Sequence, residues 1–103
     1  MFMVRHISIF FLKKEKEKSW VIEKLKELEH RLNEVSGYAV GLDCLERPTE
    51  RTPELPEFGD IVQMIDFDTA EAATAYPNQP GHMKLMEEIG EYIEKVIAID
   101  VAI

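Results

Sequence analysis

The stretch from Ala75 to Leu85, AYPNQPGHMKL, carries a tyrosine and a histidine around two prolines. Pro80 suits the first position of a helix, because its missing N–H would have no partner there. His82 then lies in the first helical turn, where the positive end of the helix dipole disfavours an added proton. A neutral imidazole beside a carboxylate can act as a general base. His82 is therefore the first candidate for proton transfer.

Asp100 is the candidate carboxylate partner of His82. On its face of the last strand it lies between Ala98 and Ala102, so a second side chain has room to lie over it. A purely structural interpretation also stands. In that case the His82–Asp100 hydrogen bond only pins the last strand to the helix, because buried polar groups need partners whether or not they catalyse.

Two further side chains could act with this pair. Tyr76 could stabilise an enolate oxygen, or its ring could simply close a cavity. His6 lies among apolar residues of the first strand and could equally be a satisfied interface histidine. No His-x-His or His-x₃-His spacing occurs, so no metal site is expected. The sequence also shows no glycine-rich phosphate loop, Ser–His–Asp constellation or dinucleotide fingerprint, and no cofactor is expected.

The strands and helices that must position these residues are predicted from changes in the spacing of apolar residues along the sequence. The pattern predicts strands over residues 2–12, 38–45, 60–68 and 96–103, helices over 17–35, 69–76 and 81–95, and an exposed loop over 46–58. Gly37 is expected to end the first helix in the left-handed conformation. The order β-α-β-β-α-β predicts an α+β, ferredoxin-like fold, in which both helical layers cover one face of a four-stranded antiparallel sheet.

The other face of this sheet is expected to be apolar as well. The residues assigned to it are Phe2, Val4, Phe10 and Leu12, with Val40, Leu42 and Met64 as further members. An exposed apolar area of this size is untypical of a monomer. Face-to-face pairing of two sheets would bury it, so the sequence predicts a homodimer that forms a closed, dimeric α+β barrel.

Composition limits the other partners. The chain has 12 Lys and Arg against 20 Asp and Glu, a net charge of −8, which argues against binding to nucleic acid or to an anionic membrane. Cys44 is the single cysteine, so no disulfide forms within the chain and a cytoplasmic location is expected. The apolar strand pattern around Cys44 predicts that this side chain is buried as a small hydrophobic residue.

Three stretches of the sequence, MVRHISIFFLK, YPNQPGHMKL and VIAIDVAI, resemble the stress-responsive A/B barrel domain (Dabb) family. They cover both ends of the chain and the second helical region. The resemblance implies one such domain over residues 1–103. It also implies a dimeric α+β barrel with a cavity between sheet and helices.

The resemblance extends to candidate site residues. In one branch of the family, the plant polyketide cyclases, a histidine of the first strand acts with a tyrosine and a histidine of the second helical region. An aspartate of the last strand supports the second histidine there. The residues in the matching places here are His6, Tyr76, His82 and Asp100.

Two functions follow as expectations. The first is a homodimeric protein that binds a small hydrophobic or keto ligand in its cavity, without catalysis. The alternative is a cofactor-free cyclase, isomerase or lyase that acts on a small keto substrate with His82 as general base. A cofactor-free monooxygenase on the same barrel is a third class, and nothing in the sequence favours oxygen chemistry over proton transfer.

Overall fold

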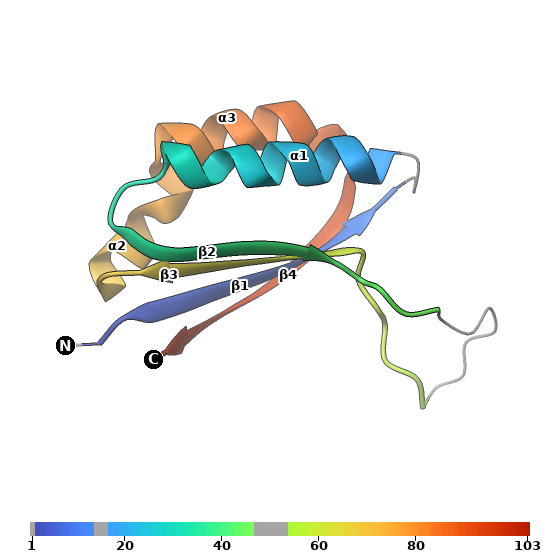
Figure 1. Cartoon of the computed structure of the whole chain (residues 1–103), viewed down its shortest axis with the longest axis horizontal. Coiled ribbons are helices and arrows are strands. Elements are labelled where there is room, and N and C mark those ends of the chain that lie inside the picture. Colours follow the sequence, from blue (N-terminus) through green and yellow to red (C-terminus); the bar gives the residue numbers. More distant parts are fainter. Residues whose placement is uncertain (1, 14–16, 47–53) are drawn as a thin grey trace.

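The computed structural model describes residues 2–13, 17–46 and 54–103. Its strands are β1 (Val4–Leu12), β2 (Val35–Leu42), β3 (Ile61–Phe67) and β4 (Ile93–Ala102). Its helices are α1 (Lys18–Leu28), α2 (Ala70–Ala75) and α3 (Pro80–Ile89), followed respectively by the 3-10 turns η2 (Glu29–Arg31), η3 (Tyr76–Asn78) and η4 (Gly90–Tyr92). The strands form one antiparallel sheet in the order β2-β3-β1-β4, with the helices on one face (Figure 1). The predicted ferredoxin-like fold is confirmed.

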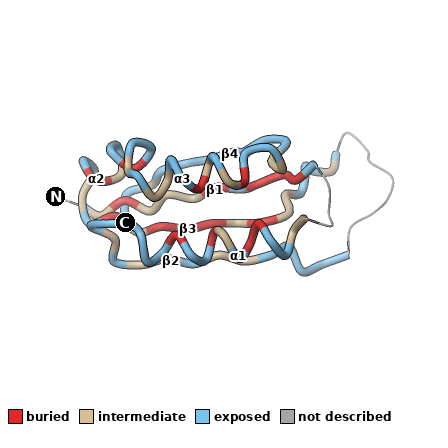
Figure 2. Tube along the Cα trace, turned by 90° about the horizontal axis from the view of Figure 1, so that it is seen from above, coloured by how far each residue is buried: buried red, intermediate tan, exposed pale blue. Residues whose placement is uncertain are grey.

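The core lies between the sheet and the helices. Ile65 and Phe67 of β3, Leu25 of α1 and Ile89 of α3 are all fully buried. β1 and β3 form the middle of the sheet and carry most of its buried residues, whereas β4 is exposed along nearly its whole length (Figure 2). The core is therefore open on the side of β4.

The two faces of the sheet are exchanged relative to the prediction. Val4, Phe10 and Leu12 are buried beneath the helices, and Val40 packs against the same core. Assigning these residues to the uncovered face was wrong. Alternation with a period of two separates the two faces of a strand, but when both are apolar it does not tell which one the helices cover.

The uncovered face is nevertheless apolar. The strand register places on it Ile7, Ile9, Val62, Met64, Ile97 and Ile99, which we call the open face. Met64 also belongs to the predicted set. At one end of this face Arg5 donates to Asp66, with 2.7 Å between Nε and Oδ1, and the ion pair lowers the pKa of the Asp66 carboxyl. An apolar sheet face that a second copy could cover is therefore present, but most of the residues on it differ from those predicted.

The first helix is shorter than the apolar period suggests. α1 ends at Leu28, and the backbone turns into β2 at Glu34, whose φ is 59°. Leu32 and Val35 continue the apolar spacing because they pack on the same core from outside the helix. The spacing of the apolar residues therefore predicted correctly which side chains pack on the core, but it predicted the end of the helix wrongly.

Gly37 has a different role from the one predicted. It lies within β2 and pairs with Asp66 of β3. A Cβ at this position would lie 2.9 Å from Asp66 Oδ2, so the close approach of that carboxylate explains the glycine. It does not end a helix.

The second helical region begins as predicted. Thr69 Oγ1 accepts a hydrogen bond from the Ala72 N–H at 3.0 Å and caps α2, and Pro80 is the first residue of α3. However, α3 ends at Ile89 instead of continuing to residue 95. The chain from Ile93 onward pairs with β1, and strand pairing overrides the helical pattern there.

The connection between β2 and β3 includes most of the predicted loop. Residues 47–53 of that loop lie outside the described part of the chain. Cys44 follows the end of β2 and is exposed, so the prediction that it is buried in a strand is wrong. In the residues that the structure describes, no helix is long and apolar enough to cross a membrane.

Candidate functional site

The four predicted site residues form one cluster on the side where the core is open. His6 of β1 and Asp100 of β4 lie directly opposite each other in the sheet. Tyr76 begins η3, and His82 lies in the first turn of α3. The centroid of the Tyr76 ring is 5.4 Å from that of His6 and 4.5 Å from that of His82. The tyrosine ring therefore contacts both imidazoles.

Asp100 is the partner of His6 and not of His82. The distance from His6 Nδ1 to Asp100 Oδ1 is 2.7 Å, so the predicted His82–Asp100 pair is wrong. Strand register explains the difference, because residues directly opposite in an antiparallel pair share one face and are nearest neighbours. His6 therefore faces the helices and does not lie on the face available to a second sheet.

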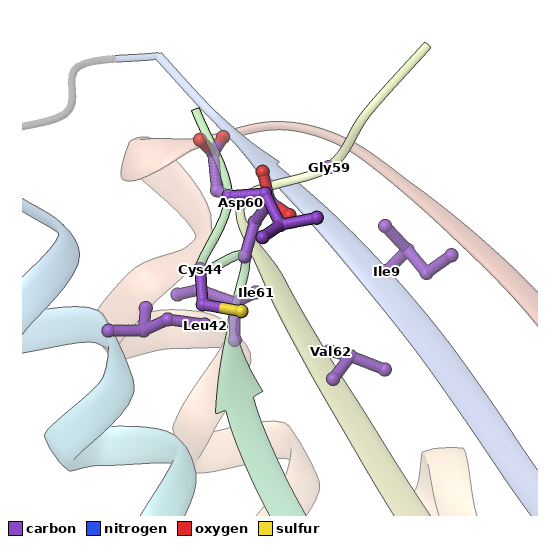
Figure 3. Close-up of a pocket in the computed structure, with 9 residues that line it drawn as sticks. Ile9, Leu42, Cys44, Gly59, Asp60, Ile61 and Val62 are labelled. Carbon is purple, nitrogen blue, oxygen red and sulfur yellow. The ribbon is translucent and has the colours of Figure 1, made fainter. Parts of the chain in front are cut away.

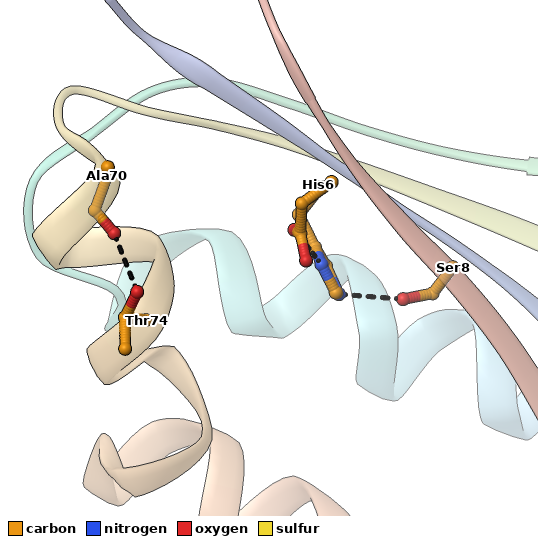
Figure 4. Close-up of polar contacts among 5 residues, drawn as sticks. His6, Ser8, Ala70 and Thr74 are labelled. Carbon is orange, nitrogen blue, oxygen red and sulfur yellow. Dashed lines mark hydrogen bonds and ion pairs between the residues drawn. The ribbon is translucent and has the colours of Figure 1, made fainter.

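Ser8 completes a hydrogen-bonded line with these two residues. Its hydroxyl lies 2.8 Å from His6 Nε2 (Figure 4). No Ser–His–Asp constellation was predicted, yet a spacing of two residues on one strand already places Ser8 on the face of His6. Ser8 is buried and its hydroxyl contacts His6 Nε2, so it is placed to orient the imidazole. Both ring nitrogens of His6 therefore have partners.

His82 is arranged differently. Its Nδ1 lies 3.1 Å from the carbonyl oxygen of Pro77. A carbonyl can only accept, so Nδ1 carries the proton and Nε2 carries a lone pair. Within the described ranges 2–13, 17–46 and 54–103, no hydrogen-bond partner meets Nε2. Burial lowers the pKa of His82, which keeps the ring neutral near pH 7 with one nitrogen available to accept a proton.

Tyr76 supplies a protonated hydroxyl. The residue is buried, and this burial raises the pKa of its phenol well above the ordinary value. Its ring also packs against Phe67, at 5.2 Å between centroids. Tyr76 therefore remains a hydrogen-bond donor over the physiological pH range.

Two polar residues next to Tyr76, Gln63 and Tyr38, were not predicted as part of the site. Gln63 Nε2 donates to the Tyr38 hydroxyl at 3.0 Å, and that hydroxyl donates to the backbone carbonyl of Leu25. Burial raises the pKa of Tyr38 to about 12. The sequence does contain a signal for this contact, a single glutamine, Gln63, within the strand segment IVQMIDF. A buried amide needs hydrogen-bond partners, so a polar neighbour could have been expected there.

Comparison with known families identifies the fold's relatives. A family model for the Stress responsive A/B Barrel Domain matches residues 4–103. The chain belongs to this family. No curated protein sequence matches the chain.

Several solved structures resemble this A/B barrel domain. A dimeric ferredoxin-like protein of unknown function from Thermobifida fusca YX shares 22% identity over 99% of this chain and 92% of its own, with a TM-score of 0.75. A Dabb family protein from Mesorhizobium loti shares 19% identity over 98% and 96%, with a TM-score of 0.73. A hydroxynitrile lyase from Passiflora edulis shares 18% identity over 99% and 94%, with a TM-score of 0.75. At these identities the likeness shows the fold.

In this A/B barrel domain a cavity of about 370 Å³ meets the cluster at Asp100, the one member of the four that lines it. It lies between α2 and β4, and Asp100 lines it together with the small residues Ala73 and Ala102. On the α2 side the Thr74 hydroxyl donates to the Ala70 carbonyl at 3.0 Å (Figure 4), so its hydrogen stays within the helix. The cavity is therefore mainly apolar, with a carboxylate at one wall.

The lowered pKa of His82 should make the domain less stable in mild acid. As pH falls through the ordinary value of about 6.5, the unfolded chain binds the proton before the folded chain does. The neutral His82 ring therefore contributes fully to the free energy of unfolding at pH values above its pKa in the unfolded chain. This contribution is lost as the pH falls through its lower pKa in the folded chain. Urea midpoints measured between about pH 7.5 and pH 5 should fall more for the wild type than for His82→Gln. His30→Gln, at an exposed histidine, should behave like the wild type.

Proposed function

We propose that this A/B barrel domain is a homodimer that binds a small, mainly apolar molecule bearing a carbonyl group, between β4 and the helices. One observation carries the proposal. Through Asp100, the polar cluster of His6, Tyr76, His82 and Asp100 adjoins a mainly apolar cavity at the only strand that the helices leave exposed among those described. Ligand sites typically combine an apolar wall with a few convergent polar groups.

The proposed partner in the assembly is a second copy of the chain. Helices cover one face of the sheet, and no element within residues 2–13, 17–46 and 54–103 covers the apolar open face. The similar Thermobifida protein is described as dimeric, which supports the same arrangement here. The single cysteine, which forms no disulfide within the chain, supports a cytoplasmic location.

A second function, proton abstraction next to a carbonyl, is favoured by the His82 geometry. His82 Nε2 would take the proton from carbon, and the electron pair left behind would move into the carbonyl to form an enolate. Tyr76 is then the candidate donor to the enolate oxygen, because both ring nitrogens of His6 already have partners. A hydroxynitrile lyase shares this fold, so lyase chemistry is compatible with it.

Thermal unfolding with a panel of small β-keto acids and lactones tests the binding proposal. At least one compound should raise the melting temperature of the wild type, by mass action on the folded state. Ala102→Leu should abolish this shift because it fills the cavity. Ala75→Leu, the same change at an exposed position of α2 outside the cavity lining, should keep it. If no compound shifts the melting temperature and none is consumed, the binding and catalytic proposals both fail.

A further inference from the structure

The two described parts of the connection between β2 and β3 project away from the helices. These parts, residues 43–46 and 54–60, are called the arm here. In Figure 1 the arm leaves the end of the sheet and runs to the side opposite α1 and α3, beyond the level of the strands. The arm and the open face therefore form two sides of one concave corner.

The base of the arm is fixed to the sheet. Asp43 N–H donates to the Asp60 carbonyl at 3.0 Å, and Asp60 N–H donates to the Phe10 carbonyl at 2.9 Å. The Asp60 carboxylate also accepts from the backbone N–H of Leu12 at 2.8 Å. Gly59 packs so closely that a Cβ there would lie 2.1 Å from Ile9 Cγ2. These contacts build the direction of the arm into the fold.

A cavity of about 310 Å³ occupies the corner between the arm and the open face (Figure 3). We call it the notch. Ile9 and Val62 line it from the open face, and Leu42, Cys44 and Leu45 line it from the end of β2 and the arm. Asp43 and Asp60, at the base of the arm, also border it. Leu45 is 64% exposed in the single chain. The notch is thus a mainly apolar site that continues directly into the open face.

We infer that the notch receives an apolar side chain from the open face of a second copy, so that the two arms clasp the dimer reciprocally. The inference rests on the proposed homodimer and adds the surface that completes it. A two-fold interface uses the same patch on both copies, so each chain supplies one arm and one open face. Two chains of charge −8 repel each other, and they can associate closely only where the contact surface is low in charge. The open face offers that surface, and the notch extends it with apolar side chains beside the carboxylates of Asp43 and Asp60.

Cys44 provides a direct readout of the notch. It is the only cysteine of the chain, it is exposed in the single chain, and it lines the notch. The rate of thiol labelling by a maleimide can be measured across protein concentration, with dimer formation followed in parallel by analytical ultracentrifugation. We expect labelling to slow by about tenfold or more as the dimer forms, because the occupied notch shields the thiol.

Two variants separate the notch from the open face. Leu45→Ser should weaken the dimer by about tenfold, as loss of an apolar contact at an interface does, without changing the urea midpoint of the monomer. Met83→Ser removes another well-exposed apolar side chain from α3, on the helical side, and should change neither property. If the dimer forms while Cys44 labelling and Leu45→Ser show no effect, the notch inference is overturned and the homodimer stands. If the wild type is monomeric at every concentration, the proposed homodimer itself fails.

Discussion

Replacing His82 with glutamine is expected to lower turnover of a keto substrate by about 10²–10⁴-fold while ligand binding persists. Glutamine can still donate to the Pro77 carbonyl, so the first turn of α3 keeps its contact. It has no nitrogen that can accept a proton at neutral pH. Rates and ligand-induced melting shifts should therefore separate in this variant, since only the chemical step needs the base.

The control for this experiment uses the same substitution elsewhere. His30→Gln changes an exposed histidine in η2 and should leave both rate and binding unchanged. Asp100→Asn should act through His6, the residue it contacts, and leave the His82 contact to Pro77 intact. If His82→Gln turned over substrate at the wild-type rate, His82 would not be the base, and the binding function alone would remain.

Replacing Ile99 with aspartate is expected to weaken the homodimer by about 10²-fold or more, because the new charge meets an apolar surface and its own symmetry mate. Ile99 is 59% exposed in the single chain and lies on the open face. Folding should survive, since no buried contact is lost. Light scattering should then report a mass near 11.9 kDa where the wild type gives twice that value.

Val96 offers a matched control on the same strand. It is 44% exposed, but the register places it opposite Phe10, on the side of the helices. Val96→Asp should therefore leave the dimer intact. Equal weakening by both substitutions would show that association does not use the open face, and a second surface would have to be sought.

The order of the elements could be predicted because it depends on local signals. The change from period two to period 3.6 marks each transition, and Thr69 and Pro80 mark helix starts by chemistry that acts within a few residues. The covered face of β1 could not be predicted, because Val4 and Ile7 are equally apolar. Only the packing of the helices distinguishes them.

The four candidate residues lie together as predicted, but they pair differently from the prediction. His6, Tyr76, His82 and Asp100 do lie together, yet the partner of Asp100 depends on the alignment of β1 with β4. A shift of that register by one residue would turn the carboxylate to the opposite face. No local pattern in the sequence encodes such a long-range alignment.

The pairing of β1 with β4 also bears on how the chain folds. His6 and Asp100 are 94 positions apart in sequence, so their contact requires the closure of a loop that contains most of the protein. The entropy lost in closing a loop grows with its length, and folds rich in such distant contacts form slowly. The β2–β3 ladder and the helices can assemble without β4, whereas the cluster around His6 cannot. During synthesis the site should therefore be completed last, after the final strand has joined a sheet that is already largely in place.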